Sequence, residues 1–204
     1  MADVSDLPPI YYLRHGETEW NRQRRIQGQI DIPLNDTGLG QARRMAARLR
    51  DVVDTLDDFQ LMASPLTRTR QTMQAVLDAY GASNADVLFD DRLKELNFGL
   101  FEGKQWADVH AAGVQPEIDP EGYHDWRPDE GEGYADGRER VADWLTSLSG
   151  PVIVVAHGGI SRILRGIVFD LPKREIVALK VPQDRFFRIA NGGLDWFDAR
   201  EMPA

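Results

Sequence analysis

Short apolar runs alternate along the chain with longer amphipathic segments. The segment 35–53 places Leu39, Ala42, Ala46 and Leu49 on one helical face, which predicts an amphipathic helix. Two more helices are expected, one over about 66–80 and one that follows residue 159. The apolar runs have the length and composition of buried β-strands, and they cover residues 10–13, 61–63, 152–156, 186–190 and 194–197.

This order of elements predicts an α/β fold. Strands that are apolar throughout are typical of a parallel sheet covered on both faces, so we expect a three-layer αβα sandwich with a mostly parallel central sheet. Asn191-Gly192-Gly193 predicts a hairpin between the last two strands, which adds an antiparallel edge strand. Ser64 and Pro65 are expected to cap the helix at 66–80. A chain of 204 residues is expected to form one domain over 1–204.

Three strand-to-helix junctions carry cationic or titratable side chains. In open α/β sheets, ligands bind beyond the carboxyl ends of the strands, where helix N-termini present free N–H groups. If the three strands are neighbours, two histidines, two arginines and a helix N-terminus converge on a spot that suits a phosphoryl dianion. The junctions are Arg14-His15-Gly16, Ser64 to Arg68, and His157-Gly158-Gly159.

Charge is unevenly distributed. The formal net charge of −9 argues against nucleic acid and anionic membranes as partners. Residues 101–150 hold twelve Asp and Glu against four Lys and Arg, so most of the excess lies there. This block includes 113–133, which is rich in Pro, Gly and carboxylates and predicts a short helical or loop insertion over the site, cap-like, at about 104–133.

Other classes of protein are disfavoured. The chain has no cysteine and hence no thiolate nucleophile, and its histidines and carboxylates lack a metal-binding spacing such as HExxH, so no metal or cofactor is expected. No run approaches the length of a membrane span, and MADVSDLPPI does not have the pattern of a signal peptide. We therefore expect a cytoplasmic protein; the oligomeric state is left open.

The segment LRHGETEWN (13–21) resembles the signature of the histidine phosphatase superfamily, in its phosphoglycerate-mutase-like branch. The resemblance continues in order over most of the chain, and the combination of blocks is specific. The further blocks are QGQIDIPLNDTGLGQA (27–42), ASPLTRTRQT (63–72), ELNFGLFEG (95–103), GEGYADGRERV (131–141) and VAHGGISRIL (155–164).

The resemblance implies a role for each of several residues. His15 would accept the phosphoryl group, since a neutral imidazole is nucleophilic near pH 7. Arg14 and Arg68 would bind the equatorial oxygens and lower the pKa of His15, and His157 would be a third donor. The resemblance also implies that Asn21, Gln27 and the backbone N–H of Gly158 surround the phosphate.

A carboxyl group must protonate the leaving alkoxide. The residues alone do not choose between Glu95 and Glu102; the resemblance assigns Glu95, and Glu102 is then expected to be an exposed surface carboxylate. Gly133 stands where the family has Ser, and with Gly137 it is expected to loosen the helix that follows.

These features predict a metal-independent phosphomonoesterase of the small phosphatase type, with a small-molecule phosphomonoester as substrate. A phosphoglycerate-type mutase and a catalytically weak phosphate- or phosphoprotein-binding module are the alternatives. The insertion favours a phosphatase, since its 28 residues from Lys104 to Gly131 form too short a lid to protect a phosphohistidine from water.

The insertion also bears on specificity. Trp106, Tyr123, His124 and Trp126 are expected to form a pocket wall, with a solvated loop as the alternative. If its carboxylates rim the pocket, with only Arg127 or Lys104 as nearby cations, leaving groups without charge should be preferred.

Overall fold

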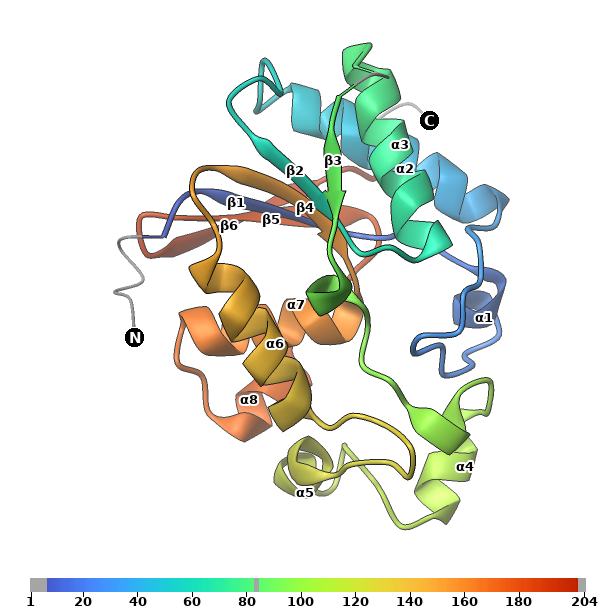
Figure 1. The fold of residues 1–204 in the computed structure, drawn as a ribbon. Coiled ribbons are helices and arrows are strands. Elements are labelled where there is room, and N and C mark those ends of the chain that lie inside the picture. Colours follow the sequence, from blue (N-terminus) through green and yellow to red (C-terminus); the bar gives the residue numbers. More distant parts are fainter. Residues whose placement is uncertain (1–6, 83–84, 202–204) are drawn as a thin grey trace.

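A six-stranded mixed sheet lies between two layers of helices in the computed structural model, which describes residues 7–82 and 85–201 (Figure 1). The strands are β1 (Ile10–Arg14), β2 (Gln60–Ala63), β3 (Val87–Phe89), β4 (Val152–Ala156), β5 (Arg185–Ala190) and β6 (Gly193–Asp198). The helices are α1 (Glu19–Arg22), α2 (Asp36–Arg50), α3 (Thr67–Tyr80), α4 (Trp106–Ala111), α5 (Pro120–Asp125), α6 (Tyr134–Thr146), α7 (Gly158–Val168) and α8 (Lys173–Ala178), with 3₁₀ turns η2 (Asp91–Leu93) and η3 (Gly99–Phe101).

The sheet order is β3-β2-β4-β1-β5-β6. Neighbouring strands from β3 to β1 are parallel, and β5 and β6 form the antiparallel hairpin at one edge, so the predicted fold class is confirmed. Strand β3 was not predicted, because it has only three residues and Leu88 is 59% exposed at the sheet edge. Arg14 pairs with Ala156 in the parallel register of β1 and β4, which brings the next residues, His15 and His157, to the same place.

Apolar cores fill both faces of the sheet. Helices α2 and α3 cover one face, and α6, α7 and α8 cover the other (Figure 1). Every residue of β4 is fully buried, as its unbroken apolar sequence predicts. Alternate residues of β1 serve the two cores: Tyr11 and Leu13 face α2 and α3, while Ile10 and Tyr12 face the other layer. The strand ends that carry the candidate chemistry are therefore held firmly from both sides.

The acidic insertion is folded onto the body of the molecule. It contains α4 and α5, and α5 packs against α8. Tyr123 is only 5% exposed and contacts Trp106, Trp126 and Tyr134 through its ring. The alternative of a solvated loop is therefore wrong for Tyr123 and Trp126, whereas Trp106 is 36% exposed.

Two local expectations are also wrong. Leu66, and not Ser64, is the N-cap of α3; Asp31 instead caps this helix, accepting the N–H of Thr67 at 2.7 Å and its hydroxyl at 2.7 Å. Gly137 does not loosen α6: a Cβ there would lie 2.6 Å from side-chain atoms of Ile163 and of Leu96, so the glycine permits close packing of α6 on α7.

Gly133 is the N-cap of α6, and a Cβ at this position would lie 2.9 Å from the carbonyl oxygen of Trp126. The backbone N–H of Gly133 donates to Asp136 at 2.9 Å, so the helix start is held without a side chain at the cap.

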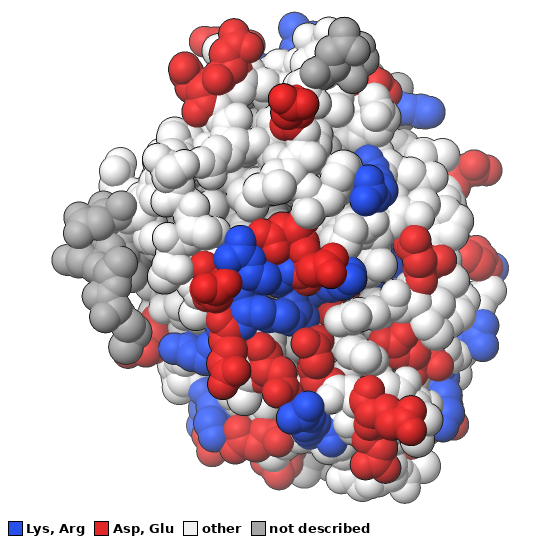
Figure 2. Space-filling model, in the orientation of Figure 1, with Lys and Arg blue, Asp and Glu red and all other residues white. Residues whose placement is uncertain are grey.

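In the described part of the chain, no helix has the length and apolarity needed to cross a membrane. Residues 1–6, which begin the segment considered above for a signal peptide, lie outside the described residues. Figure 2 shows basic side chains gathered near the middle of one face with acidic ones packed among them, so this face has no broad area of a single charge.

Candidate active site

His15 directly follows β1 and is 3% exposed. Its Nδ1 lies 2.7 Å from the carbonyl oxygen of Gly16. Because a carbonyl can only accept, Nδ1 carries the proton and donates it, and the neutral ring keeps its lone pair on Nε2. The backbone thus selects the tautomer with Nε2 available as a nucleophile.

The pKa of His15 is held well below its usual value. Burial is the largest cause, followed by the charges of Arg68 and Arg14. The effect of the two arginines was predicted from the sequence, but the larger effect of burial was not. The ring is therefore neutral at physiological pH, as a nucleophile must be.

His157 follows β4, and its ring centroid lies 5.2 Å from that of His15. Nδ1 accepts the Nε–H of Arg68 at 3.3 Å, and Nε2 lies 2.8 Å from the Oγ of Ser64. Burial and the Arg68 charge hold the pKa of His157 well below its usual value, so this ring is neutral too. Both nitrogens are thus engaged within the protein, and a donor role toward phosphate requires the ring to exchange a partner.

Arg68, in the first turn of α3, is completely buried. Its Nη1 donates to the carbonyl of Ile30 at 3.0 Å and its Nη2 to that of Gly28 at 2.7 Å. Burial lowers the pKa of Arg68 to about 10, against an opposing effect of Glu95, and leaves it charged at neutral pH. A guanidinium has five N–H groups, so one on each terminal nitrogen remains for a ligand.

Glu102 holds the loop that engages Arg68. Its carboxylate accepts the backbone N–H groups of Gln29 at 2.7 Å, Ile30 at 2.8 Å and Phe98 at 3.1 Å. The expectation of an exposed surface carboxylate is therefore wrong. Glu102 fixes the backbone whose carbonyls bind Arg68, so it positions Arg68 indirectly.

Two donors of predicted site residues are buried without a partner. The Nη1 of Arg14 donates to the carbonyl of Val181, but its Nε has no acceptor. Gln27 accepts the hydroxyl proton of Thr18 at 2.8 Å, while its amide nitrogen has no acceptor. A buried unpaired donor costs about 1–3 kcal/mol. Unpaired buried donors on two of the predicted phosphate-binding residues are consistent with a place for an anion.

Gly158 opens α7 next to Arg14: a Cβ on Gly158 would lie 3.5 Å from the guanidinium carbon. Glu95 lies at the same helix start, where its carboxylate accepts the N–H of Gly159 at 3.0 Å and that of Leu96 at 3.0 Å. The charge of Glu95 acts on both Arg14 and Arg68. The structure therefore places the predicted carboxyl residue at the N-terminal end of α7, where Gly158 lies next to Arg14.

Asn21 lies in α1 and caps that helix through its side chain. Its Oδ1 also accepts a hydrogen bond from Gln183 at 3.0 Å, and Gln183 donates to the backbone carbonyl of His15 at 3.2 Å. Gln183 was not identified from sequence, and Ser64 was placed at one of the three junctions but was expected only to cap the helix. Ser64 carried a signal, since it follows a buried strand; Gln183 lies in a loop without one.

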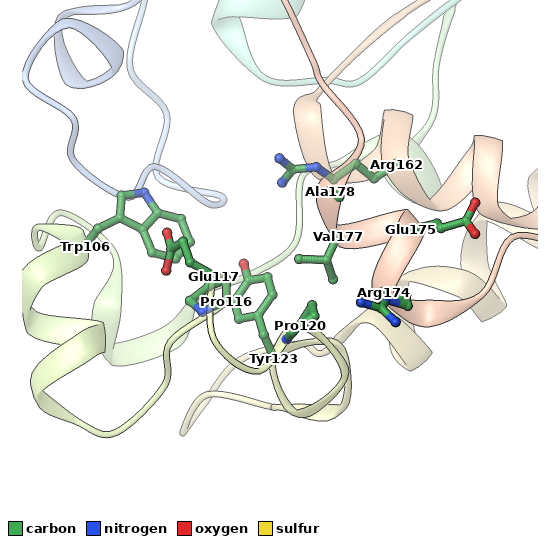
Figure 3. Close-up of a pocket in the computed structure, with 10 residues that line it drawn as sticks. All are labelled: Trp106, Pro116, Glu117, Pro120, Tyr123, Arg162, Arg174, Glu175, Val177 and Ala178. Atoms are coloured by element: carbon green, nitrogen blue, oxygen red, sulfur yellow. The ribbon is translucent and has the colours of Figure 1, made fainter.

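The acidic insertion lines a cavity of about 680 Å³, and Figure 3 shows Trp106, Glu117 and Tyr123 on one side of it. The opposite side carries Arg162 and Arg174, from α7 and α8. Arg127 and Lys104, the cations expected near the pocket, do not line this cavity. Across residues 7–82 and 85–201, no group of three His, Asp or Glu residues has a metal-binding arrangement.

Comparison with known proteins places this geometry in a family. The model of the histidine phosphatase superfamily (branch 1) matches residues 10–190. A protein of Enterobacter sp. (strain 638) named "Probable phosphoglycerate mutase GpmB" is 34% identical over 205 residues, which cover 95% of this chain and 86% of that protein. The protein of the same name from Escherichia coli (strain K12 / DH10B) is 36% identical over 200 residues, covering 94% and 85%.

Solved structures are also similar to this chain. A mycobacterial glucosyl-3-phosphoglycerate phosphatase in complex with VO3 is 26% identical, with a TM-score of 0.74 over 94% of this chain and 98% of that chain. The alpha-ribazole phosphatase from Shigella flexneri, 21% identical with a TM-score of 0.75 over 96% of each chain, shares the fold. The chain belongs to the histidine phosphatase superfamily, branch 1.

Proposed function

We propose that the protein is a metal-independent phosphomonoesterase that works through a phosphohistidine on Nε2 of His15. The observation that carries this proposal is the hydrogen bond from Nδ1 of His15 to the carbonyl of Gly16, which leaves Nε2 unprotonated. The unpaired donors of Arg14 and Gln27 supply binding groups for the phosphoryl oxygens.

The reaction has two displacements. Nε2 of His15 attacks phosphorus while the ester P–O bond breaks, and Glu95 gives its proton to the leaving oxygen. Water then attacks the phosphohistidine, Glu95 takes a proton from that water, and phosphate leaves with the neutral histidine restored. The fixed charges of Arg14 and Arg68 stabilise the equatorial oxygens in both steps.

The names of the relatives divide between hydrolysis and isomerisation: a solved structure is named a phosphatase, and curated relatives are named mutases. The mycobacterial structure is of a phosphatase with bound VO3, a mimic of the phosphoryl group. The curated relatives are named as mutases, which keeps a mutase as the second candidate. The short insertion favours hydrolysis, because water reaches a phosphohistidine that no long lid covers.

Trapping the intermediate tests the proposal. Brief mixing with a ³²P-labelled phosphomonoester should label the protein with the acid-labile, base-stable character of phosphohistidine. His15→Asn should abolish both labelling and turnover of p-nitrophenyl phosphate, while His110→Asn, in α4, should retain both. Turnover by His15→Asn within about tenfold of the parent would refute the covalent mechanism. Conversion of 3-phosphoglycerate to its 2-isomer without release of phosphate would establish the mutase.

A further inference from the structure

A second cavity lies beside the hairpin of β5 and β6 and shares no lining residue with the cavity in Figure 3. This hairpin cavity has a volume of about 760 Å³, and no residue predicted for the phosphoryl site lines it. The charged and aromatic side chains of its wall are Arg165, Lys180, Asp184, Arg185, Trp196 and Arg200. Four cations against one carboxylate make the hairpin cavity positive, although the whole chain has a formal net charge of −9. A cleft lined mainly by one sign of charge concentrates ions of the opposite sign.

Arg165, in α7, is the buried cation of this wall, with an exposed fraction of 4%. Its Nε donates to the carbonyl of Ser161 at 3.1 Å, and its Nη2 donates to that of Lys180 at 3.0 Å. The guanidinium carbon also lies 5.4 Å from the ring centroid of Phe187 and 5.5 Å from that of Trp196. These contacts hold the side chain in place, but the two hydrogen bonds use only two of its five N–H groups.

The charges of Arg165 and Lys180 are not balanced within the described residues, where no carboxylate lies within 4.0 Å of either group. Arg185 and Arg200, in contrast, both pair with Asp198, at 3.1 Å and 2.5 Å. Burial lowers the pKa of Arg165 to about 10, which leaves it charged at neutral pH. Because buried charges in proteins are normally paired, a buried cation that faces a cavity without a counter-ion indicates a place for an anion.

The loop that carries Lys180 is fixed from two sides. The carbonyl of Lys180 accepts the hydrogen bond from Arg165, and the carbonyl of the next residue, Val181, accepts one from Arg14 of the phosphoryl site. The backbone from which the Lys180 side chain extends is therefore held before any ligand arrives, which lowers the entropic cost of binding.

We propose that the hairpin cavity is a second anion site, separate from the phosphoryl site, where Arg165 and Lys180 bind a ligand that carries a diphosphate group. Two cations without counter-ions match the two phosphate groups. The volume of about 760 Å³ exceeds that of a diphosphate, and the indole of Trp196, 39% exposed, offers an apolar surface to a ring attached to it. Free diphosphate and a nucleoside diphosphate share this chemistry and differ in the ring.

Isothermal titration calorimetry with imidodiphosphate, whose P–N–P bridge resists hydrolysis, tests the site in about 0.1 M salt. Lys180→Gln should raise the Kd about tenfold, because it removes a hydrogen bond between charged groups, and the exposed side chain is not part of the core. Arg165→Gln should raise the Kd at least as much. Lys173→Gln is the matched control, since it removes the same charge from an exposed position of α8 outside the cavity. Its Kd should stay within about twofold of the parent.

Inhibition of p-nitrophenyl phosphate hydrolysis separates the hairpin cavity from the phosphoryl site. The inhibition constant of imidodiphosphate should be the same in Lys180→Gln as in the parent, because Lys180 does not contact His15. A rise in this constant that parallels the rise in Kd would place the probe at His15 and overturn the proposal. A parent that does not bind the probe, an unchanged Kd in Lys180→Gln, or an equal loss in Lys173→Gln would also overturn it. The calorimetry does not depend on which reaction His15 performs.

The α,β-imido analogue of ADP distinguishes the two ligand sources. Binding about tenfold tighter than that of imidodiphosphate, with the gain lost in Trp196→Ala, would identify a nucleotide, since stacking on an aromatic side chain is worth this much. Equal or weaker binding would identify diphosphate without a ring.

Discussion

The Nε–H of Arg68 donates to Nδ1 of His157, so the first turn of α3 is tied to the end of β4 inside the phosphoryl site. Arg68 thereby fixes the second histidine as well as offering N–H groups to a ligand. We expect Arg68→Ala to lower kcat/KM at least about a hundredfold, because both functions are lost. Lysine should rescue little, since it cannot contact His157, Gly28 and Ile30 together. Full rescue by lysine would mean that only the charge matters.

Arg14 should behave differently on replacement by lysine. Its Nη1 contacts a single carbonyl, that of Val181, and its Nε is unpaired. We expect Arg14→Ala to lower kcat/KM about a hundredfold and Arg14→Lys to recover more activity than the lysine variant of Arg68 does. Steady-state assays on p-nitrophenyl phosphate make the comparison. The reverse order of rescue would contradict the roles assigned to the two arginines.

A variant of Glu102 tests whether the backbone at Gln29 and Ile30 positions the site. Glu102→Gln replaces one accepting oxygen with an NH₂ group that faces backbone donors, so the loop at Gln29 and Ile30 should lose its position. We expect a loss of about 1–3 kcal/mol in the free energy of unfolding and about tenfold in kcat. Glu139→Gln, at an exposed position of α6, is the control and should change neither. Parent-like stability in Glu102→Gln would remove Glu102 from the support of the site.

Removal of metal ions and inhibition by vanadate test the metal-independent mechanism. Because Arg14 and Arg68 carry the positive charge required by the proposed reaction, dialysis against EDTA should leave kcat unchanged. Vanadate should inhibit competitively, since it can adopt five-coordinate geometry over Nε2 of His15. Restoration of activity only by Mg²⁺ or Zn²⁺ after EDTA would contradict the metal-independent mechanism.

The two buried neutral histidines make stability depend on pH. Burial holds the pKa values of His15 and His157 below those of the unfolded chain, so as pH falls through about 6.5 the unfolded state takes up protons that the folded state does not. The free energy of unfolding should therefore fall toward acid pH, by up to about 1.4 kcal/mol per pH unit for each histidine. Urea unfolding at several pH values between about 7.5 and 5 measures the slope.

His15→Asn removes one of the two histidines that take up a proton only in the unfolded state. Its slope below about pH 6.5 should be shallower than that of the parent by up to about 1.4 kcal/mol per unit. Identical slopes in the parent and the variant would show that His15 does not contribute to the pH dependence of stability.

Sequence patterns predicted the parts of the molecule that follow from local rules. The unbroken apolar run of β4 and the Asn191-Gly192 turn each have one ready structural meaning, and both are confirmed. His15 and His157 come together because the parallel strands β1 and β4, which they follow, end at the same edge of the sheet.

Contacts between distant segments were not predictable. Asp31 caps α3 from 36 positions away, and Glu102 binds backbone 73 positions away. The pattern within one segment does not identify partners in another. The charges of residues 101–150 were counted by themselves, so Arg162, which lines the same cavity from α7, was left out.

The two halves of the site rest on elements of unequal local stability. His15 and His157 follow strands buried at the centre of the sheet, whereas the cavity wall is built on α4, α5 and α8, each only six residues long. Helices this short persist only through their packing, so their amides should exchange with solvent by local opening, while those of β1 and β4 should await global unfolding. Substitutions in the wall can thus change which alcohol is accepted without disturbing phosphoryl transfer, which lets members of one family diverge in substrate while sharing a reaction.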